Sequence, residues 1–181
     1  MKFTPTKKFP EVIVIEPRVF GDARGFFYES YREDLFTQQG IRTRFVQDNQ
    51  SRSAKGGLRA LHFQTKPKEQ AKLVHVANGE VFDVVVDIRQ GSKTFGQYYD
   101  IILSAENKRL LYIPKGFAHG FLALKDNTEF IYKVSDYYSP QHERGILWND
   151  PAIGIAWPKL DVDYLLSEKD KKNPNLQDVF R

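Results

Sequence analysis

The feature that most constrains this chain is a succession of short apolar runs separated by turn-forming residues. Val, Ile, Phe and Tyr dominate the runs, and Gly, Pro, Asn and Asp lie between them, which is typical of strands and turns. The runs are "EVIVIEP", "GFFYES", "TRFVQDNQ", "LRALHFQ", "AKLVHV", "EVFDVVVDI", "YYDIIL", "RLLYIP", "GFLAL" and "EFIYKVSDYY". Helical patterns do not alternate with them, which argues against a parallel α/β sheet. The sequence therefore predicts an all-β sandwich, jelly roll or barrel.

The helical content is predicted to be small. Residues 31–40, "YREDLFTQQG", have the pattern of one short helix that ends at a glycine. The chain of 181 residues suits a single domain over residues 1–181, large enough to bury about 70% of its unfolded surface. Its last part, from about residue 160 to residue 181, is expected to make a helical turn and then continue as an irregular tail.

Composition excludes several classes of function. The absence of cysteine rules out disulfides, thiolate chemistry and Cys-based metal sites. No apolar run approaches the roughly 18 residues of a membrane span, and the N-terminus lacks a signal-peptide pattern, so a cytoplasmic location is expected. The net charge of +4 comes from 27 basic residues dispersed among 23 acidic ones, whereas nucleic-acid binding favours a clustered patch. We expect neither a membrane nor a nucleic-acid partner.

Residues 71–88 predict a β-hairpin that turns at Asn78-Gly79, the strongest short hairpin signal. In that register Lys72 and Asp83 are diagonal neighbours. Alternation places one set of residues on the same face: Lys72, Val74, Val76, Val81, Asp83 and Val85. Two interpretations remain open, because a buried charged pair is costly. The pair is either a partly exposed ion pair at a sheet edge, or a lysine held charged in a dry cavity that faces an anion.

Polar side chains interrupt several other strands. The interrupting residues are His62, His119, Tyr132 and Lys133, together with Gln47, Asp48 and Asn49 after an apolar pair. Each one alone is explained by a hydrogen-bonded core residue or a turn. Together they would leave many buried polar groups without partners. A barrel with a polar ligand cavity accounts for all of them.

Metal-dependent and nucleophilic chemistry are both disfavoured. His62 and His75 lie thirteen residues apart, no His-x-His pair occurs, and a lysine beside the site would repel a cation. Alternation also places His75 on the face opposite Lys72, outside the cavity. The chain lacks cysteine, a Gly-x-Ser-x-Gly motif and a glycine-rich phosphate loop. Proton transfer by His, Lys, Tyr and carboxylates remains, and no metal is predicted.

A series of blocks in the chain resembles one known family. The blocks run in order from about residue 3 to residue 174: "FGDARGFFYES", "FVQDNQS", "LRALHFQ", "AKLVHVANGEVFDVVVDIR", "SAENKRLLYIPKGFAHGF", "YKVSDYYSP" and "GILWNDPAIGIAW". They closely resemble the dTDP-4-dehydrorhamnose 3,5-epimerases. The resemblance implies a cupin-type jelly-roll β-barrel that forms a homodimer and needs no metal or organic cofactor. It implies the conversion of dTDP-4-dehydro-6-deoxy-D-glucose to dTDP-4-dehydro-L-rhamnose.

The resemblance also implies the catalytic roles. His62 would be the base, and Asp170 would fix its tautomer and favour the imidazolium. Lys72, kept charged by Asp83, would stabilise the enolate oxygen, which is the role of an oxyanion hole. Tyr132 would return the proton from the opposite face of the sugar.

Other matched positions are implied ligand contacts. Arg24, Arg59 and Lys169 would bind the diphosphate, because cationic groups suit phosphate oxygens. Tyr138 would stack on the thymine. The residues implied to touch the nucleotide or sugar are Glu29, Gln47, Asn49, His119 and Glu143.

Two points qualify the resemblance. Strict alternation places Arg59 and His62 on opposite faces of one strand, so Arg59 needs a bulge, a strand-end position or a neighbouring subunit. Ala60 stands where many relatives have Gly, and Gln50 stands where some have His, but neither change removes a reacting group. A mono-epimerase or keto-isomerase for another dTDP-deoxysugar remains the alternative.

Overall fold

The computed structural model describes residues 1–180, which are almost entirely β-structure. Its helical elements are the short helix α1 (Glu33–Gln38) and the 3₁₀ turn η1 (Asp170–Lys172). The strands are β1 (Lys2–Pro5), β2 (Ile13–Glu16), β3 (Phe20–Asp22), β4 (Gly25–Phe27), β5 (Gln47–Ser53), β6 (Leu58–Gln64), β7 (Lys72–Asn78), β8 (Glu80–Asp87), β9 (Tyr98–Ser104), β10 (Leu110–Ile113), β11 (Phe117–Ala123), β12 (Thr128–Val134) and β13 (Glu143–Gly145). The predicted all-β class with a few short helices is confirmed.

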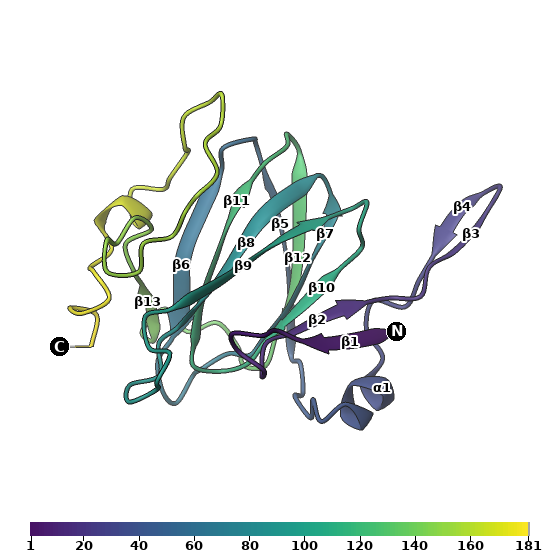
Figure 1. The fold of residues 1–181 in the computed structure, drawn as a ribbon, viewed down its shortest axis with the longest axis horizontal. Coiled ribbons are helices and arrows are strands. Elements are labelled where there is room, and N and C mark those ends of the chain that lie inside the picture. Colours follow the sequence, from purple (N-terminus) through teal and green to yellow (C-terminus); the bar gives the residue numbers. More distant parts are fainter. Residues whose placement is uncertain (181) are drawn as a thin grey trace.

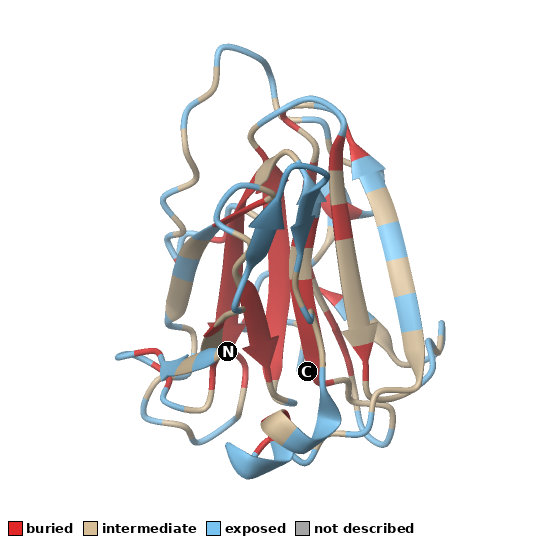
Figure 2. Cartoon of the chain, turned by 90° about the vertical axis from the view of Figure 1, so that its right-hand side faces the viewer, coloured by how far each residue is buried: buried red, intermediate tan, exposed pale blue. Residues whose placement is uncertain are grey.

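Two antiparallel sheets face each other and form the barrel (Figure 1). One sheet has the order β1-β2-β10-β7-β12-β5, and the other has the order β13-β6-β11-β8-β9. Apolar side chains from both sheets meet between them: Val74, Val76, Val81, Val85, Leu103, Leu111 and Phe130 belong to one buried cluster. Figure 2 shows the buried residues concentrated in the strands of the barrel. This arrangement is a jelly roll.

The predicted β7–β8 hairpin is wrong, although the predicted inward face is right. β7 pairs with β10 and β12, whereas β8 pairs with β11 and β9, so the two strands lie in different sheets. Gly79, with φ +80°, turns the chain from one sheet into the other. Lys72, Val74, Val76, Val81, Asp83 and Val85 are nevertheless all buried. Alternation within a strand does not depend on its partner, which explains why this set survives the wrong pairing.

A β-bulge in β6 shapes the inner wall of the barrel. His119 lies opposite His62 and Phe121 lies opposite Arg59, so two steps along β11 match three steps along β6. β6 therefore contains one extra residue, which reverses the alternation between Arg59 and His62. A Cβ at Gly120, in the facing strand, would lie 2.6 Å from the Cβ of Ala60. Glycine allows this close approach of β11 to the bulge.

Two regions lie outside the barrel, namely helix α1 and the β3–β4 hairpin. Helix α1 is shorter than residues 31–40 because Arg32 is extended, with φ −148°, and Gly40 follows its end with φ +81°. Phe36 anchors the helix by packing against Phe3 at 5.1 Å between ring centroids. Strands β3 and β4 form a separate hairpin that projects away from the barrel (Figure 1).

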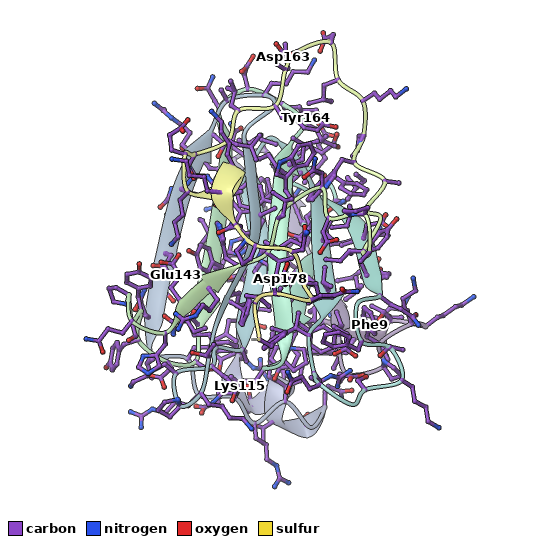
Figure 3. The ribbon with its side chains drawn as sticks, turned by 90° about the vertical axis from the view of Figure 1, so that its left-hand side faces the viewer. Phe9, Lys115, Glu143, Asp163, Tyr164 and Asp178 are labelled. Atoms are coloured by element: carbon purple, nitrogen blue, oxygen red, sulfur yellow. The ribbon has the colours of Figure 1, made fainter. Side chains whose placement is uncertain are left out.

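The C-terminal segment runs along the outside of the barrel, next to β6. Leu165 makes a parallel bridge with Gly57, and Leu176 is buried in a core cluster with β6 residues. Figure 3 shows Asp163 and Tyr164 on the outer loop of this segment. The prediction of one domain over residues 1–181 stays a prediction, and its final residue lies outside the described residues. Within residues 1–180, no helix is long and apolar enough to cross a membrane.

Candidate active site

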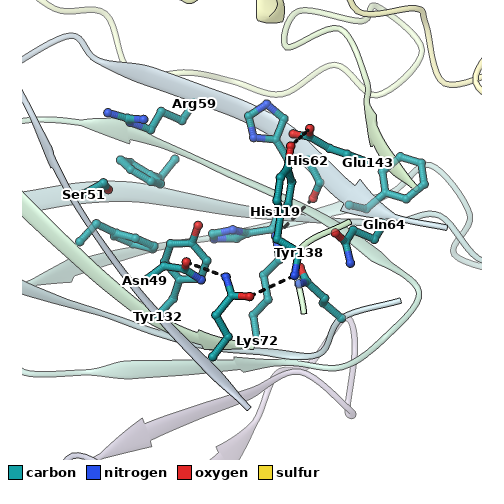
Figure 4. Close-up of a pocket in the computed structure, with 15 residues that line it drawn as sticks. Asn49, Ser51, Arg59, His62, Gln64, Lys72, His119, Tyr132, Tyr138 and Glu143 are labelled. Carbon is teal, nitrogen blue, oxygen red and sulfur yellow. Dashed lines mark hydrogen bonds between the residues drawn. The ribbon is translucent and has the colours of Figure 1, made fainter. Parts of the chain in front are cut away.

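A cavity of about 220 Å³ opens between the two sheets of the barrel. Strands β5, β6, β7, β11, β12 and β13 contribute to its wall, and Figure 4 shows their side chains converging on it. Its lining residues are Gln47, Asn49, Ser51, Arg59, His62, Phe63, Gln64, Gln70, Lys72, His119, Phe121, Phe130, Tyr132, Tyr138 and Glu143. Most of the residues expected to act on a ligand are thus brought to one place.

His62 and Asp170, 108 residues apart in sequence, form a close pair. His62 Nε2 lies 2.6 Å from Asp170 Oδ1, and Asp170 is only 4% exposed. Burial raises the pKa of Asp170, but the hydrogen bonds from His62 and Ser167 outweigh it and leave the pKa below its usual value. Asp170 is therefore a carboxylate near pH 7, and it holds the imidazole ring by one nitrogen.

Lys72 is a buried amine on the opposite sheet. Its Nζ donates to the backbone oxygen of His62 at 3.4 Å. Burial lowers the pKa of Lys72 to about 8, against the opposing charges of Asp83 and Glu143. Because this value still exceeds 7, the lysine remains largely an ammonium at neutral pH.

Asp83 contacts His119 rather than Lys72. His119 Nε2 lies 2.9 Å from Asp83 Oδ2, and both side chains are buried. The other carboxylate oxygen, Oδ1, is buried without a hydrogen-bond partner among the described residues. Lys72 and Asp83 are therefore neighbours, as predicted, and the charge of Asp83 raises the pKa of Lys72. Within residues 1–180 the two side chains form no direct ion pair, because Asp83 pairs with His119.

His119 lines the cavity and lies opposite His62 where β11 pairs with β6. Burial lowers the pKa of His119, although the charge of Asp83 raises it. Its ring also stacks on Phe130, with the centroids 5.9 Å apart. His119 is therefore a buried imidazole whose Asp83 hydrogen bond compensates for the cost of burying its polar ring.

Tyr132 enters the cavity from the sheet opposite His62. It lies on β12 and pairs with Asn49 of β5 and Val74 of β7. Burial raises the pKa of Tyr132, and the positive charge of Arg59 opposes that rise. The cavity therefore has an imidazole on one side and a protonated phenol on the other. Lys72 lies on the side of the phenol, because β7 and β12 are neighbours in one sheet.

The rim of the cavity combines an aromatic ring with charged groups. Tyr138 is 54% exposed, and its hydroxyl donates to Glu143 Oε2 at 2.7 Å (Figure 4). Lys169 Nζ lies 2.5 Å from the same oxygen. Burial raises the pKa of Glu143, but its bonds with Lys169 and Tyr138 hold the pKa below its usual value. Lys169 does not line the cavity, yet it contacts its rim through Glu143.

Arg59 faces the cavity because of the bulge, which resolves the conflict with strict alternation. Its Nε donates to Ser53 Oγ at 3.2 Å. On β5, Gln47 and Asn49 point into the cavity, and Gln47 Nε2 donates to Asn49 Oδ1 at 2.9 Å. Gln47 Oε1 also accepts from the backbone nitrogen of Tyr138 at 3.0 Å, which ties β5 to the rim.

Two predicted ligand contacts are not brought to the cavity within the chain. Arg24 lies in the turn of the projecting β3–β4 hairpin, where it pairs with Asp22 and its side chain is 90% exposed. Glu29 is exposed and pairs with Arg32. Neither lines the cavity, so their assignment as ligand contacts stays a prediction.

Several cavity residues were missed by sequence reasoning. Ser51 continues the period-two pattern of Gln47 and Asn49, and Gln64 lies two residues after His62, so alternation could have found both. Gln64 Oε1 accepts from Ser139 N at 2.7 Å, and its Nε2 donates to Lys68 O at 2.6 Å, which fixes two loops at the rim. Gln70, Phe121 and Phe130 had no polar pattern to mark them.

Metal binding finds no support in the arrangement of potential ligands. Across residues 1–180, no three His, Asp or Glu side chains are grouped so as to hold a metal ion. His75 lies outside the cavity, as predicted. That the protein needs no metal stays a prediction.

Comparison with known proteins identifies the family. Residues 6–178 match the family model described as dTDP-4-dehydrorhamnose 3,5-epimerase. The epimerase of Pseudomonas aeruginosa is 55% identical over 171 residues, covering 94% of this chain and 93% of that protein. The Salmonella typhimurium epimerase is 56% identical over 172 residues, with coverage of 94% and 93%.

A solved structure agrees with this match. The dTDP-6-deoxy-D-glucose-3,5-epimerase of Legionella pneumophila, in complex with dTDP-4-keto-L-rhamnose, has a TM-score of 0.94 and 50% identity. The match covers 98% of this chain and 94% of that chain. The cupin-type jelly roll implied by the sequence resemblance is thereby confirmed. This chain belongs to the dTDP-4-dehydrorhamnose 3,5-epimerase family.

Proposed function

We propose that the protein is an isomerase that converts dTDP-4-dehydro-6-deoxy-D-glucose to dTDP-4-dehydro-L-rhamnose by inverting C3 and C5. One observation supports this most strongly: the His62–Asp170 pair and Tyr132 approach one cavity from opposite sheets. An epimerase needs a base on one face of the carbon and an acid on the other. Lys72, which is buried on the same sheet as Tyr132, adds a cation to the cavity lining.

The reaction follows from the chemistry of the C4 ketone, which acidifies the hydrogens on both C3 and C5. His62 removes one of these protons, and Asp170 stabilises the imidazolium that forms. Lys72 stabilises the negative charge on the C4 oxygen of the enolate. Tyr132 then protonates the carbon from the opposite face, and the sequence of steps repeats at the second carbon.

The charged and aromatic rim supports binding of a nucleoside diphosphate. Arg59 in the cavity and Lys169 at its rim supply positive charge for the diphosphate, and Tyr138 offers an exposed ring for the thymine. Glu143, Gln47 and Asn49 add polar contacts beside it. We infer that the partner is this sugar nucleotide and that the protein acts as a cytoplasmic homodimer.

A cofactor-free reaction is consistent with this chemistry. Each inversion removes and returns one proton, and the product is an isomer of the substrate, so no net oxidation occurs. The ketone already present in the substrate provides the acidity. The residues of the cavity supply the remaining acid, base and positive charge.

The test is turnover in D2O followed by NMR at C3 and C5. The proposal predicts deuterium at both carbons together with inversion at both. Exchange and inversion at one carbon alone would identify a mono-epimerase. Binding of dTDP without any exchange into the substrate would identify a non-catalytic sugar-nucleotide binding protein.

A further inference from the structure

The acid half of the proposed reaction leaves a negative charge that His62, Asp170 and Lys72 do not neutralise in the roles proposed for them. When Tyr132 protonates the substrate carbon, its own oxygen becomes a phenolate. Burial disfavours that anion, as the raised pKa of Tyr132 indicates. A positive group directed toward Tyr132 would lower the energy of this product of the proton transfer.

Arg59 is positioned for that role by two structural features. The bulge in β6 turns its side chain to the cavity, across from the sheet that holds Tyr132. Ser53, which is 7% exposed, accepts the Nε hydrogen of Arg59 at 3.2 Å. Because the guanidinium is planar, fixing Nε restricts the direction of its two terminal amino groups. Figure 4 shows Arg59 and Tyr132 on different strands but toward the same end of the cavity.

The other charged or titratable groups that line the cavity are less suited to stabilise the phenolate. These groups are Lys72 of β7, His62 of β6, His119 of β11, Glu143 of β13 and Tyr138. Glu143 raises the pKa of Tyr132, whereas Arg59 is the charge that lowers it most. Lys72 donates to the backbone oxygen of His62 at 3.4 Å, and the charges that shift the pKa of Tyr132 are those of Arg59 and Glu143. Lys133 follows Tyr132 in β12 but pairs with Asp48 outside the cavity.

We propose that Arg59, oriented by Ser53, stabilises the phenolate that forms when Tyr132 donates its proton to the substrate carbon. The O–H electron pair stays on Tyr132 while the enolate electron pair forms the new C–H bond. Solvent then takes the proton from the His62 imidazolium and returns one to the Tyr132 phenolate, so that both groups are reset without net change. Substrate in the cavity displaces water, which strengthens the attraction between guanidinium and phenolate. This inference rests on the proposed function, in which Arg59 also contacts the diphosphate.

The first test needs no substrate, so it is independent of the proposed activity. Tyrosine labelled with ¹³C at Cζ reports the ionisation of Tyr132 by NMR, with Tyr132→Phe assigning the signal. Arg59→Gln should raise the pKa of Tyr132. Lys133→Gln is the matched control, because it removes a positive charge one residue away but outside the cavity, and it should leave the pKa unchanged. An unchanged Tyr132 pKa in folded Arg59→Gln would overturn the inference.

The second test separates phenolate stabilisation from diphosphate binding. In D2O, Arg59→Gln should lower the ratio of inversion to exchange by about tenfold, the effect of one charge-assisted hydrogen bond. Ser53→Ala should lower it less, and Ser53→Thr, which keeps the hydroxyl, should restore it. A loss of dTDP affinity with an unchanged ratio would assign Arg59 to the diphosphate alone. Circular dichroism and a melting curve establish that each variant is folded.

Discussion

Strand β8 carries two fully buried carboxylates, four residues apart, in opposite situations. Asp87 accepts hydrogen bonds from the Arg89 side chain at 2.7 and 2.8 Å, and from Ser92 Oγ and Thr94 Oγ1 at 2.6 Å each. Asp83 has one partner, His119, and one buried oxygen without any among the described residues. We call Asp87 with its partners the loop end of β8, and Asp83 with His119 and Lys72 the cavity end.

In the proposed function, this difference separates polar groups that hold the fold from polar groups that act on the ligand. At the loop end the Arg89, Ser92 and Thr94 side chains that bond to Asp87 lie within seven residues of it in sequence, and together they bond to both of its carboxylate oxygens. At the cavity end, Asp83 and Lys72 are both buried, and one Asp83 oxygen has no hydrogen-bond partner among the described residues. Buried charges with incomplete pairing are costly, and they are typical of functional sites. We therefore expect changes at the cavity to affect turnover and changes at the loop end to affect stability.

The largest effect should come from His62→Ala. Without the base, deuterium uptake and product formation should both fall, by about 10² to 10⁴ in rate. The fold should persist, because the His62 side chain is 31% exposed and lies in the cavity wall. NMR in D2O with circular dichroism checks this. Undiminished exchange in the folded variant would show that another group is the base.

Lys72→Ala should reduce turnover by about 10² to 10³, the effect of losing one oxyanion donor in other enzymes. The affinity for dTDP should change less, because the lysine acts at the sugar. Steady-state kinetics and calorimetry together measure the two effects. Lost binding with preserved turnover of bound substrate would instead assign Lys72 to the diphosphate.

The pH profile gives an independent control on Lys72 in the wild type. In the proposed function only the ammonium form of Lys72 stabilises the enolate, and burial lowers the pKa of Lys72 to about 8. kcat/KM should therefore fall as the pH rises through about 8. A profile that stays flat up to pH 10 would contradict the assigned role.

Asp87→Ala should lower the free energy of unfolding by about 3 kcal/mol, because it removes charge-assisted bonds and leaves Arg89 with fewer partners. Turnover per folded molecule should not change. Urea unfolding with kinetics below the transition measures both. Asp83→Asn is the matched change at the cavity end, and it should lower turnover more than the free energy of unfolding. If Asp87→Ala lowered turnover and Asp83→Asn lowered only stability, the distinction between the two ends would be wrong.

The pH dependence of that stability loss sharpens the comparison. Burial raises the pKa of Asp87, but its bonds to Arg89, Ser92 and Thr94 hold the net pKa well below the usual value. The carboxylate therefore contributes stability above its unfolded pKa of about 4, and that contribution is lost as the pH falls. The difference between wild type and Asp87→Ala should shrink in acid.

Chelation should have the smallest effect. Exhaustive dialysis against EDTA should leave turnover unchanged, because proton transfer needs only the side chains of the cavity. The assay with substrate before and after dialysis measures this. Loss of activity that one divalent ion restores would overturn the metal-free mechanism.

Much of the cavity could be predicted because alternation belongs to each strand by itself. It placed Lys72 and Asp83 inside and His75 outside without any knowledge of strand partners. The pairing of β7 could not be found in this way, because Asn78-Gly79 marks a turn but does not decide whether the chain stays in one sheet.

Other parts of the site depended on long-range structure. The bulge that turns Arg59 inward appears only when β6 is paired with β11. Asp170 follows from resemblance alone, because no local pattern joins it to a histidine 108 residues away. Arg24 and Glu29 match family positions in sequence, yet the fold of one chain leaves them away from the cavity.

Turnover by Tyr132→Phe in D2O tests the central claim most directly, because that claim assigns base and acid to opposite sides of one cavity. The variant keeps His62, Lys72 and the ring volume but cannot donate a proton. His62 can still remove a proton and return it on the same face, so exchange at C5 should continue while inversion falls by about 10² or more. Full inversion by Tyr132→Phe would contradict the account.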